Sequence, residues 1–159
     1  MSGSRTLRFA IPALLMVIVS ACKDSDTTTA PGSLANVTIN APGSASSGQS
    51  FTIDLAATAV GVSNVQNGQV TVTLPSPLTV NSVDASSGTS ATFTNGSGAA
   101  VSWTLGVLDA NSQSTLHVNV SGTLPSGASP QTLTLQAILT ATGIPAGDAT
   151  AQASVQLMP

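Results

Sequence analysis

Val70-Thr71-Val72-Thr73-Leu74 is the stretch that decides the fold, because its apolar and polar side chains alternate at every position. Alternation with a period of two is the pattern of a strand with one buried face and one wet face. The pattern recurs at 37–39, 51–55, 101–105, 116–120, 133–137 and 155–157. Strands of this kind pair in antiparallel sheets. The sequence therefore predicts an all-β fold, an immunoglobulin-like antiparallel β-sandwich of about seven to nine strands.

Turn residues separate these runs, and one pair of them predicts a hairpin. Asn95-Gly96 lies between two apolar stretches, and both residue types tolerate the positive φ angles of a tight turn. Trp103, the only tryptophan, occupies an inward position of its run, and so does Phe51. We expect Trp103 to lie in the core with Phe51, Phe93 and Leu105.

The clearest family pattern is Val101-Ser102-Trp103-Thr104-Leu105-Gly106-Val107-Leu108, followed by the alternating run 114–120. With the runs 48–53, 70–75 and 78–83, it resembles a family of bacterial conserved-repeat surface domains of unknown function with an immunoglobulin-like fold. This resemblance covers most of 48–142. It implies that Gly106 allows a corner between strands, that Leu108 closes the end of the core, and that the domain carries no catalytic residue. The second resemblance is to cohesin-like modules, which are scaffold domains with similar strand spacing.

The N-terminus has the pattern of a bacterial signal peptide. Arg5 and Arg8 precede a short apolar segment, 9–19, and small residues precede Cys22, the only cysteine. Val19-Ser20-Ala21-Cys22 resembles the lipobox of bacterial lipoproteins; an ordinary secretory signal peptide is the alternative. The lipobox implies cleavage before Cys22 and acyl chains, such as palmitate, on that residue. Two or more acyl chains anchor a protein stably to a membrane.

These features divide the chain into three parts. A lipoprotein signal peptide is expected at 1–21, the lipidated cysteine with a flexible tether at 22–33, and the β-sandwich domain at 34–159. The tether includes Thr27-Thr28-Thr29 and has no large apolar residue, so we do not expect it to join a core. Lys23 differs from the usual signal for retention at the inner membrane. We therefore expect a lipid-anchored protein of the bacterial cell envelope, at the outer membrane, on either of its faces.

Composition excludes several functions. No Lys or Arg follows Lys23, so the domain cannot neutralise phosphates and nucleic-acid binding is excluded. His117 is the only histidine and falls on a wet face, whereas a metal site needs three or four ligands. No Gly-x-Ser-x-Gly nucleophile elbow is present. We expect no enzymatic activity, no cofactor and no metal site, although calcium binding by Asp84, Asp109 and Asp148 in or near loops stays open.

Two interpretations of function remain. The leading one is a non-enzymatic structural or adhesive module of the cell surface, anchored through Cys22. The alternative is a protein-binding, cohesin-like module or an accessory subunit of an envelope complex.

Overall fold

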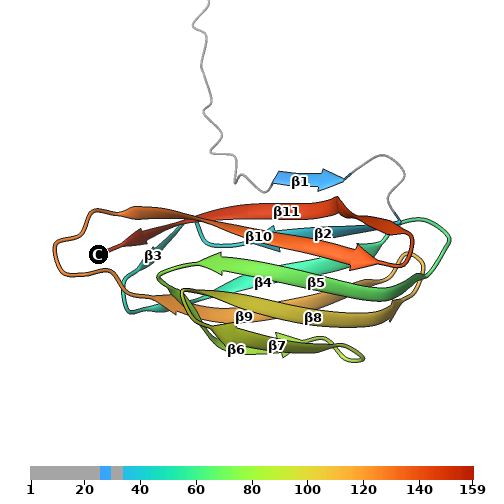
Figure 1. Ribbon diagram of the computed structural model, residues 1–159, viewed down its shortest axis with the longest axis horizontal. Coiled ribbons are helices and arrows are strands. Elements are labelled where there is room, and N and C mark those ends of the chain that lie inside the picture. The colour runs from blue at the N-terminus through green and yellow to red at the C-terminus, as the bar shows by residue number, and fades with distance from the viewer. Residues whose placement is uncertain (1–25, 30–33) are drawn as a thin grey trace, which may run out of the picture.

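The structure is a computed structural model that describes residues 26–29 and 34–159 (Figure 1). Within these residues no helix has the length and hydropathy needed to span a membrane. The described residues form eleven strands. They are β1 (Asp26–Thr29), β2 (Ala35–Asn40), β3 (Ser44–Ser46), β4 (Ser50–Ala59), β5 (Val65–Pro75), β6 (Leu78–Ala85), β7 (Ser90–Asn95), β8 (Gly98–Leu108), β9 (Gln113–Gly122), β10 (Gln131–Ala141) and β11 (Ile144–Met158).

The strands form two sheets that pack face to face (Figure 1). The seven-stranded sheet has the order β1-β11-β10-β5-β8-β7, and β3 pairs with β11 in parallel. The four-stranded sheet has the order β2-β4-β9-β6. All other pairs are antiparallel. The predicted immunoglobulin-like sandwich is therefore confirmed. The strands outnumber the prediction partly because β1 and β3 are short and lack alternating apolar residues.

The core lies between the sheets and consists of the inward side chains of both. Val70, Val72 and Leu74 of β5 are at most 1% exposed, so the stretch that decides the fold lines the core. Trp103 in β8 is fully buried at 0% exposure, and Leu105 and Leu108 are also buried. Burial of each large apolar side chain contributes about 1.5–3 kcal/mol. Because the described chain has no disulfide-forming cysteine, this core must hold the domain together.

Two aromatic residues lie less deeply than the sequence predicts. Phe51, near the start of β4, is only partly buried and packs at the margin of the core. Phe93 in β7 is 38% exposed, although its partner Val101 in β8 is fully buried. Phe93 faces the expected side of the sheet. It stays accessible because β7 is outermost among the described strands of its sheet.

Gly106 allows a β-bulge and not the expected corner between strands. Its φ is +66°, a conformation that glycine adopts at little cost. The register of the β5–β8 pair shifts on both sides of the Gly68–Gly106 partners, and β8 continues to Leu108. A bulge of this kind bends a strand and increases its twist.

The hairpin predicted at Asn95-Gly96 is present between β7 and β8, but its turn is longer than a two-residue turn. Asn95 is still paired, with Ala99, so that 96–98 form the turn. The N–H of Gly96 donates to the carbonyl of Gly98 at 2.7 Å and closes it.

The tether prediction is wrong for 26–29. These residues form β1, which pairs with β11 from Asp26 opposite Gln152 to Thr29 opposite Ala149. Strand pairing uses backbone groups, so a segment without apolar side chains can still join a sheet. The predicted signal peptide, Val19 to Cys22 and the rest of the tether lie outside the described residues.

Candidate interaction face on the four-stranded sheet

The outer face of the four-stranded sheet carries a row of charged and polar residues. Ile53 and Leu55 of β4, and Leu116 and Val118 of β9, are buried, so the residues between them point outward. The register places Asp54 opposite His117 and His117 opposite Asp84 of β6. Directly paired residues share one face, with their Cβ atoms about 4.5–5.5 Å apart. The three titratable residues therefore form one row across β4, β9 and β6.

Asp54 and His117 are joined in the structure. The distance between Oδ1 of Asp54 and Nδ1 of His117 is 2.7 Å, and the two side chains are 50% and 54% exposed. The contact orients the imidazole but leaves both groups in contact with water, where such pairs contribute little stability. Their exposure keeps them available to another molecule.

A second polar cluster lies on the same face, towards the other end of β6 and β9. The register of β6 shifts between Val80 and Ser82, which leaves Asn81 as an additional residue. Its Nδ2 donates to Oδ1 of Asn119 at 3.0 Å, and its Oδ1 accepts from the hydroxyl of Ser121 at 3.2 Å. The bulge therefore turns Asn81 into the centre of an ordered amide and hydroxyl network.

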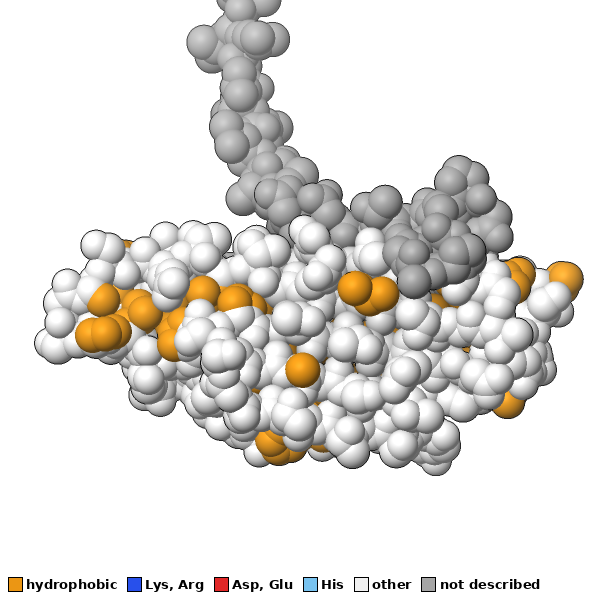
Figure 2. Space-filling view, in the orientation of Figure 1, with side chains coloured by type: hydrophobic (Ala, Val, Ile, Leu, Met, Phe, Trp, Pro, Cys, Tyr) orange, Lys and Arg blue, Asp and Glu red, His pale blue; other side chains and the backbone are white. Residues whose placement is uncertain are grey.

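The outer face of the seven-stranded sheet differs in charge. Its outward residues on β5 and β8 are small and uncharged, for example Thr71, Thr73 and Ser102. Figure 2 views the molecule from the side on which β10, β5 and β8 lie in front, and no acidic, basic or histidine side chain is visible there. Of the titratable side chains that the structure describes, three lie in the Asp54–His117–Asp84 row, and Asp109 is the fourth.

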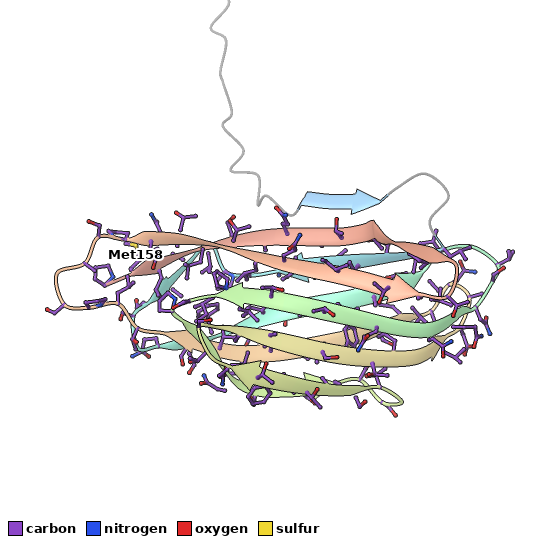
Figure 3. All side chains as sticks on the ribbon, in the orientation of Figure 1. Met158 is labelled. Atoms are coloured by element: carbon purple, nitrogen blue, oxygen red, sulfur yellow. The ribbon has the colours of Figure 1, made fainter. Side chains whose placement is uncertain are left out.

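Large apolar side chains are exposed in the segment between β4 and β5, near the end of β8 and at the end of β11. Val60 and Val62, in the segment between β4 and β5, are 46% and 94% exposed, and Val107 near the end of β8 is 55% exposed. Met158 lies at the end of β11 (Figure 3), next to Ser46 of β3.

Two of the aspartates considered as calcium ligands, Asp84 and Asp109, lie in different elements. Asp84 is the second-last residue of β6, near the loop that follows, and is a member of the charged row. Asp109 lies in the β8–β9 turn, where its Oδ1 accepts from Nδ2 of Asn64 at 3.1 Å. The side chain of Asp148 lies outside the described part. Among the described side chains, no group of three His, Cys, Asp or Glu residues could hold a metal ion.

One open hollow of about 410 Å³ lies beside the β7–β8 hairpin. Its lining contains no titratable side chain, so it offers no general acid or base. The lining residues are Thr73, Leu74, Pro75 and 94–100.

Sequence reasoning placed His117 on a wet face but missed its partners. Asp54 and His117 are 63 positions apart, and only the pairing of β4 with β9 brings them together. The one signal in the sequence was their parity, because both fall on polar positions of alternating runs. Asn81 gave no signal, because a bulge is not visible in an alternating pattern.

Solved structures similar to this chain are immunoglobulin-like and cohesin domains. A cohesin module from the family 33 glycoside hydrolase of Clostridium perfringens superposes with a TM-score of 0.60 at 14% identity, covering 79% of this chain and 97% of that one. The sixth cohesin of scaffoldin B from Acetivibrio cellulolyticus, solved in complex with a mutant Cel5 dockerin, gives 0.56 at 15% identity, covering 79% and 99%. The CARDB domain of PF1109 from Pyrococcus furiosus, solved with di-metal ions, gives 0.54 at 13%, covering 78% and 87%.

The major pilin subunit BcpA of Bacillus cereus gives a TM-score of 0.51 at 13% identity, covering 77% of this chain and 39% of that one. At these identities the similarity establishes the fold alone. No protein-family model matches the sequence, and no curated protein matches it. The chain therefore has an immunoglobulin-like β-sandwich fold, which is similar to the fold of cohesin modules.

Proposed function

We propose that this protein is a lipid-anchored, non-enzymatic binding module of the bacterial cell envelope, and that the outer face of its four-stranded sheet holds a protein partner. The Asp54–His117–Asp84 row is the observation that carries the proposal. Three of the four titratable side chains that the structure describes lie in this row, beside the ordered cluster around Asn81. The likeness to cohesins, one of them solved with a dockerin, supports a protein as the partner.

The charge of the face specifies the chemistry of the partner. Asp54 and Asp84 flank His117, and no Lys or Arg occurs after Lys23. Complementary charge guides association and selects among partners. The face therefore fits a protein surface that presents Lys or Arg side chains, with amide or hydroxyl groups to meet Asn81 and Asn119.

Capture from envelope extracts tests the proposed face. Purified protein with Cys22→Ala serves as bait, next to the same protein with Asp54→Asn and Asp84→Asn together. Asp109→Asn is the matched control, because it makes the same replacement of a carboxylate by an amide in a turn outside the row. We expect one stoichiometric partner that the double variant loses and the control retains. Equal capture by all three proteins, or by none, would reject the face.

The anchor is tested separately. Cells fed labelled palmitate should label the wild-type protein and not the Cys22→Ala form. If Cys22 begins the mature chain, Lys23 is the only site for trypsin in it. Trypsin added to intact cells should then release the whole domain when it faces outward, and leave it bound when it faces the periplasm. Palmitate labelling equal to that of Cys22→Ala would overturn the lipid anchor.

The second candidate function is a structural or adhesive surface module. The similarity to part of the pilin subunit BcpA favours it, because a pilin is a structural component. A structural spacer needs no partner that depends on the charged row. The capture experiment therefore separates the two candidates, and the trypsin experiment decides whether adhesion to an outside surface is open to the domain.

A further inference from the structure

Four of the described strands are outermost in the two sheets, β1 and β7 in one and β2 and β6 in the other, and β7 is the one that carries an exposed aromatic side chain. β7 ends the seven-stranded sheet, and no other described strand pairs with its outer side. At the opposite end of that sheet, β1 and β3 both pair with β11, and β1, with four residues, is the outermost strand. At the neighbouring edge of the four-stranded sheet, the side chain of Asn95 bonds to the backbone of Val80 in β6.

The sequence of β7 lacks the usual protection of an edge. Ser90-Ala91-Thr92-Phe93-Thr94-Asn95 contains no charge, proline or glycine. Natural sheets normally guard such edges with lysine, proline or a bulge, because an open edge is a template for another strand. Phe93 is also 38% exposed. Nothing in the sequence of β7 therefore blocks the addition of a further strand at this edge.

The pairing of the neighbouring strands shows which residues of β7 direct their backbone N–H and C=O groups outward. Pro75 has no N–H, so Pro75 and Gly98 are a non-hydrogen-bonded pair of β5 and β8. The backbone N–H and C=O of Gly98 therefore point away from β5, towards β7. The bond from Gly96 N–H to the Gly98 carbonyl agrees with this direction. Alternate residues of β8 direct their backbone groups the same way, so the backbone groups of Thr92 and Thr94 form hydrogen bonds with β8. The N–H and C=O groups of Ala91, Phe93 and Asn95 then face outward.

We propose that the partner of this edge is a second copy of the chain, and that two β7 strands pair antiparallel about a two-fold axis at Phe93. In this register Phe93 meets Phe93 of the second copy, Ala91 meets Asn95, and Thr92 meets Thr94. All three outward-facing residues of each copy are matched. A register centred on Thr92 would pair Asn95 with Thr89, whose N–H already donates to the carbonyl of Ser86 at 3.1 Å.

The side chains fit the same arrangement. The axis brings two exposed phenyl rings together on the inner side, where aromatic pairs are favourable. Thr92 and Thr94 meet on the outer side, where threonine pairs across strands are favourable. The outward positions of β8 that flank them, Ala100, Ser102 and Thr104, carry no charge, so no like charges oppose the approach.

The size of the edge sets the strength of the dimer. Six residues in one strand bury less than the roughly 1,200–2,000 Å² of a stable interface. The dimer is therefore weak in dilute solution. Confinement on a membrane raises the effective concentration, so persistence of the dimer in the cell rests on the proposed attachment through Cys22. Since the two-fold contact uses the β7 edge of both copies, pairing through β7 stops at two copies and does not produce a fibre.

Disulfide trapping tests the register. The full chain is used with Cys22→Ala, so that its only native thiol is absent and the experiment does not depend on an anchor. Thr92 and Thr94 of two copies would form a non-hydrogen-bonded pair, with Cα atoms about 4.5 Å apart, a distance that a disulfide spans. Two Thr92 residues, or two Thr94 residues, would be diagonal neighbours about 7–8 Å apart, beyond its reach.

We expect a mixture of Thr92→Cys and Thr94→Cys proteins to form a mixed disulfide dimer under mild oxidation, and neither variant alone to do so. Phe93→Lys in both proteins should reduce the mixed dimer about tenfold, because like charges then oppose each other at the axis. Equal trapping in all samples, trapping of Thr92→Cys alone, or no trapping at high concentration would overturn the proposed dimer. Failure here leaves the capture result unaffected, because the charged row lies on the other sheet.

Discussion

The indole Nε1 of Trp103 donates a hydrogen bond to Oγ1 of Thr89 at 3.0 Å, and the hydroxyl of Thr89 donates to the carbonyl of Ser86 at 2.7 Å. The polar atom of the largest buried side chain is thus satisfied from the turn before β7. The Ser86 N–H in turn donates to the carbonyl of Thr115 in β9, at 2.9 Å. This chain of bonds joins Trp103 of the seven-stranded sheet to β9, an interior strand of the four-stranded sheet.

Thr89→Val should destabilise the domain by about 1–3 kcal/mol, because the shape is kept while a buried indole N–H loses its acceptor. Trp103 is the only tryptophan and the chain has no tyrosine, so fluorescence during urea unfolding reports on this site alone. Thr92→Val, at an exposed position of β7, is the matched control and should change stability by less than about 0.5 kcal/mol. Equal effects of the two variants would contradict the role of this bond.

Asn95 is predicted to hold the two sheet edges together. Its Oδ1 accepts from the N–H of Val80 and its Nδ2 donates to the Val80 carbonyl, both at 2.9 Å. Asn95→Asp keeps the acceptor and loses the donor, whereas Asn95→Ala loses both. We expect Asn95→Ala to be the more destabilising, by about 1–3 kcal/mol, with faster hydrogen exchange at the Val80 amide. An unchanged exchange rate at Val80 would show that the bond does not protect this edge.

The sequence predicted whether a side chain points inward or outward better than it predicted which residues lie beside it. Alternation assigned Val70, Trp103 and Leu116 to the core correctly, because parity within a strand is a local property. It could not show that β7 is an outermost strand, so Phe93 was expected to lie in the core with Trp103. It also could not show that Gly106 is at a bulge, because a shift in register depends on the partner strand.

The candidate site depends still more on pairing. Asp54, Asp84 and His117 each appear as single polar residues in the sequence, and they form a row only because β9 lies between β4 and β6. β1 was missed for a different reason. Its Thr-rich sequence buries nothing by itself, and its place in the sheet comes from the open backbone groups of β11.

Gly98→Ala is predicted to destabilise the β7–β8 hairpin. A Cβ atom at this position would lie 2.8 Å from the carbonyl oxygen of Leu74, which is held in the β5–β8 ladder and cannot move freely. Crowding of this kind costs about 1–3 kcal/mol. Gly43→Ala is the matched control, because nothing lies within 4 Å of a Cβ atom there. A lower melting temperature for Gly98→Ala alone is the expected result; no difference between the two variants would contradict the close approach.

The Asp54–His117 pair is predicted to contribute little to folding, which makes it suitable for testing binding. Both side chains are about half exposed, so a double-mutant cycle with Asp54→Asn and His117→Gln should give a coupling of about 0.2–1 kcal/mol. If the pair served mainly to stabilise the fold, its coupling free energy would be larger. A coupling of several kcal/mol in urea unfolding would mean that loss of capture by an Asp54 variant reflects a damaged sheet. A small coupling combined with lost capture would assign the pair to recognition, because the fold would then be intact while the partner is no longer bound.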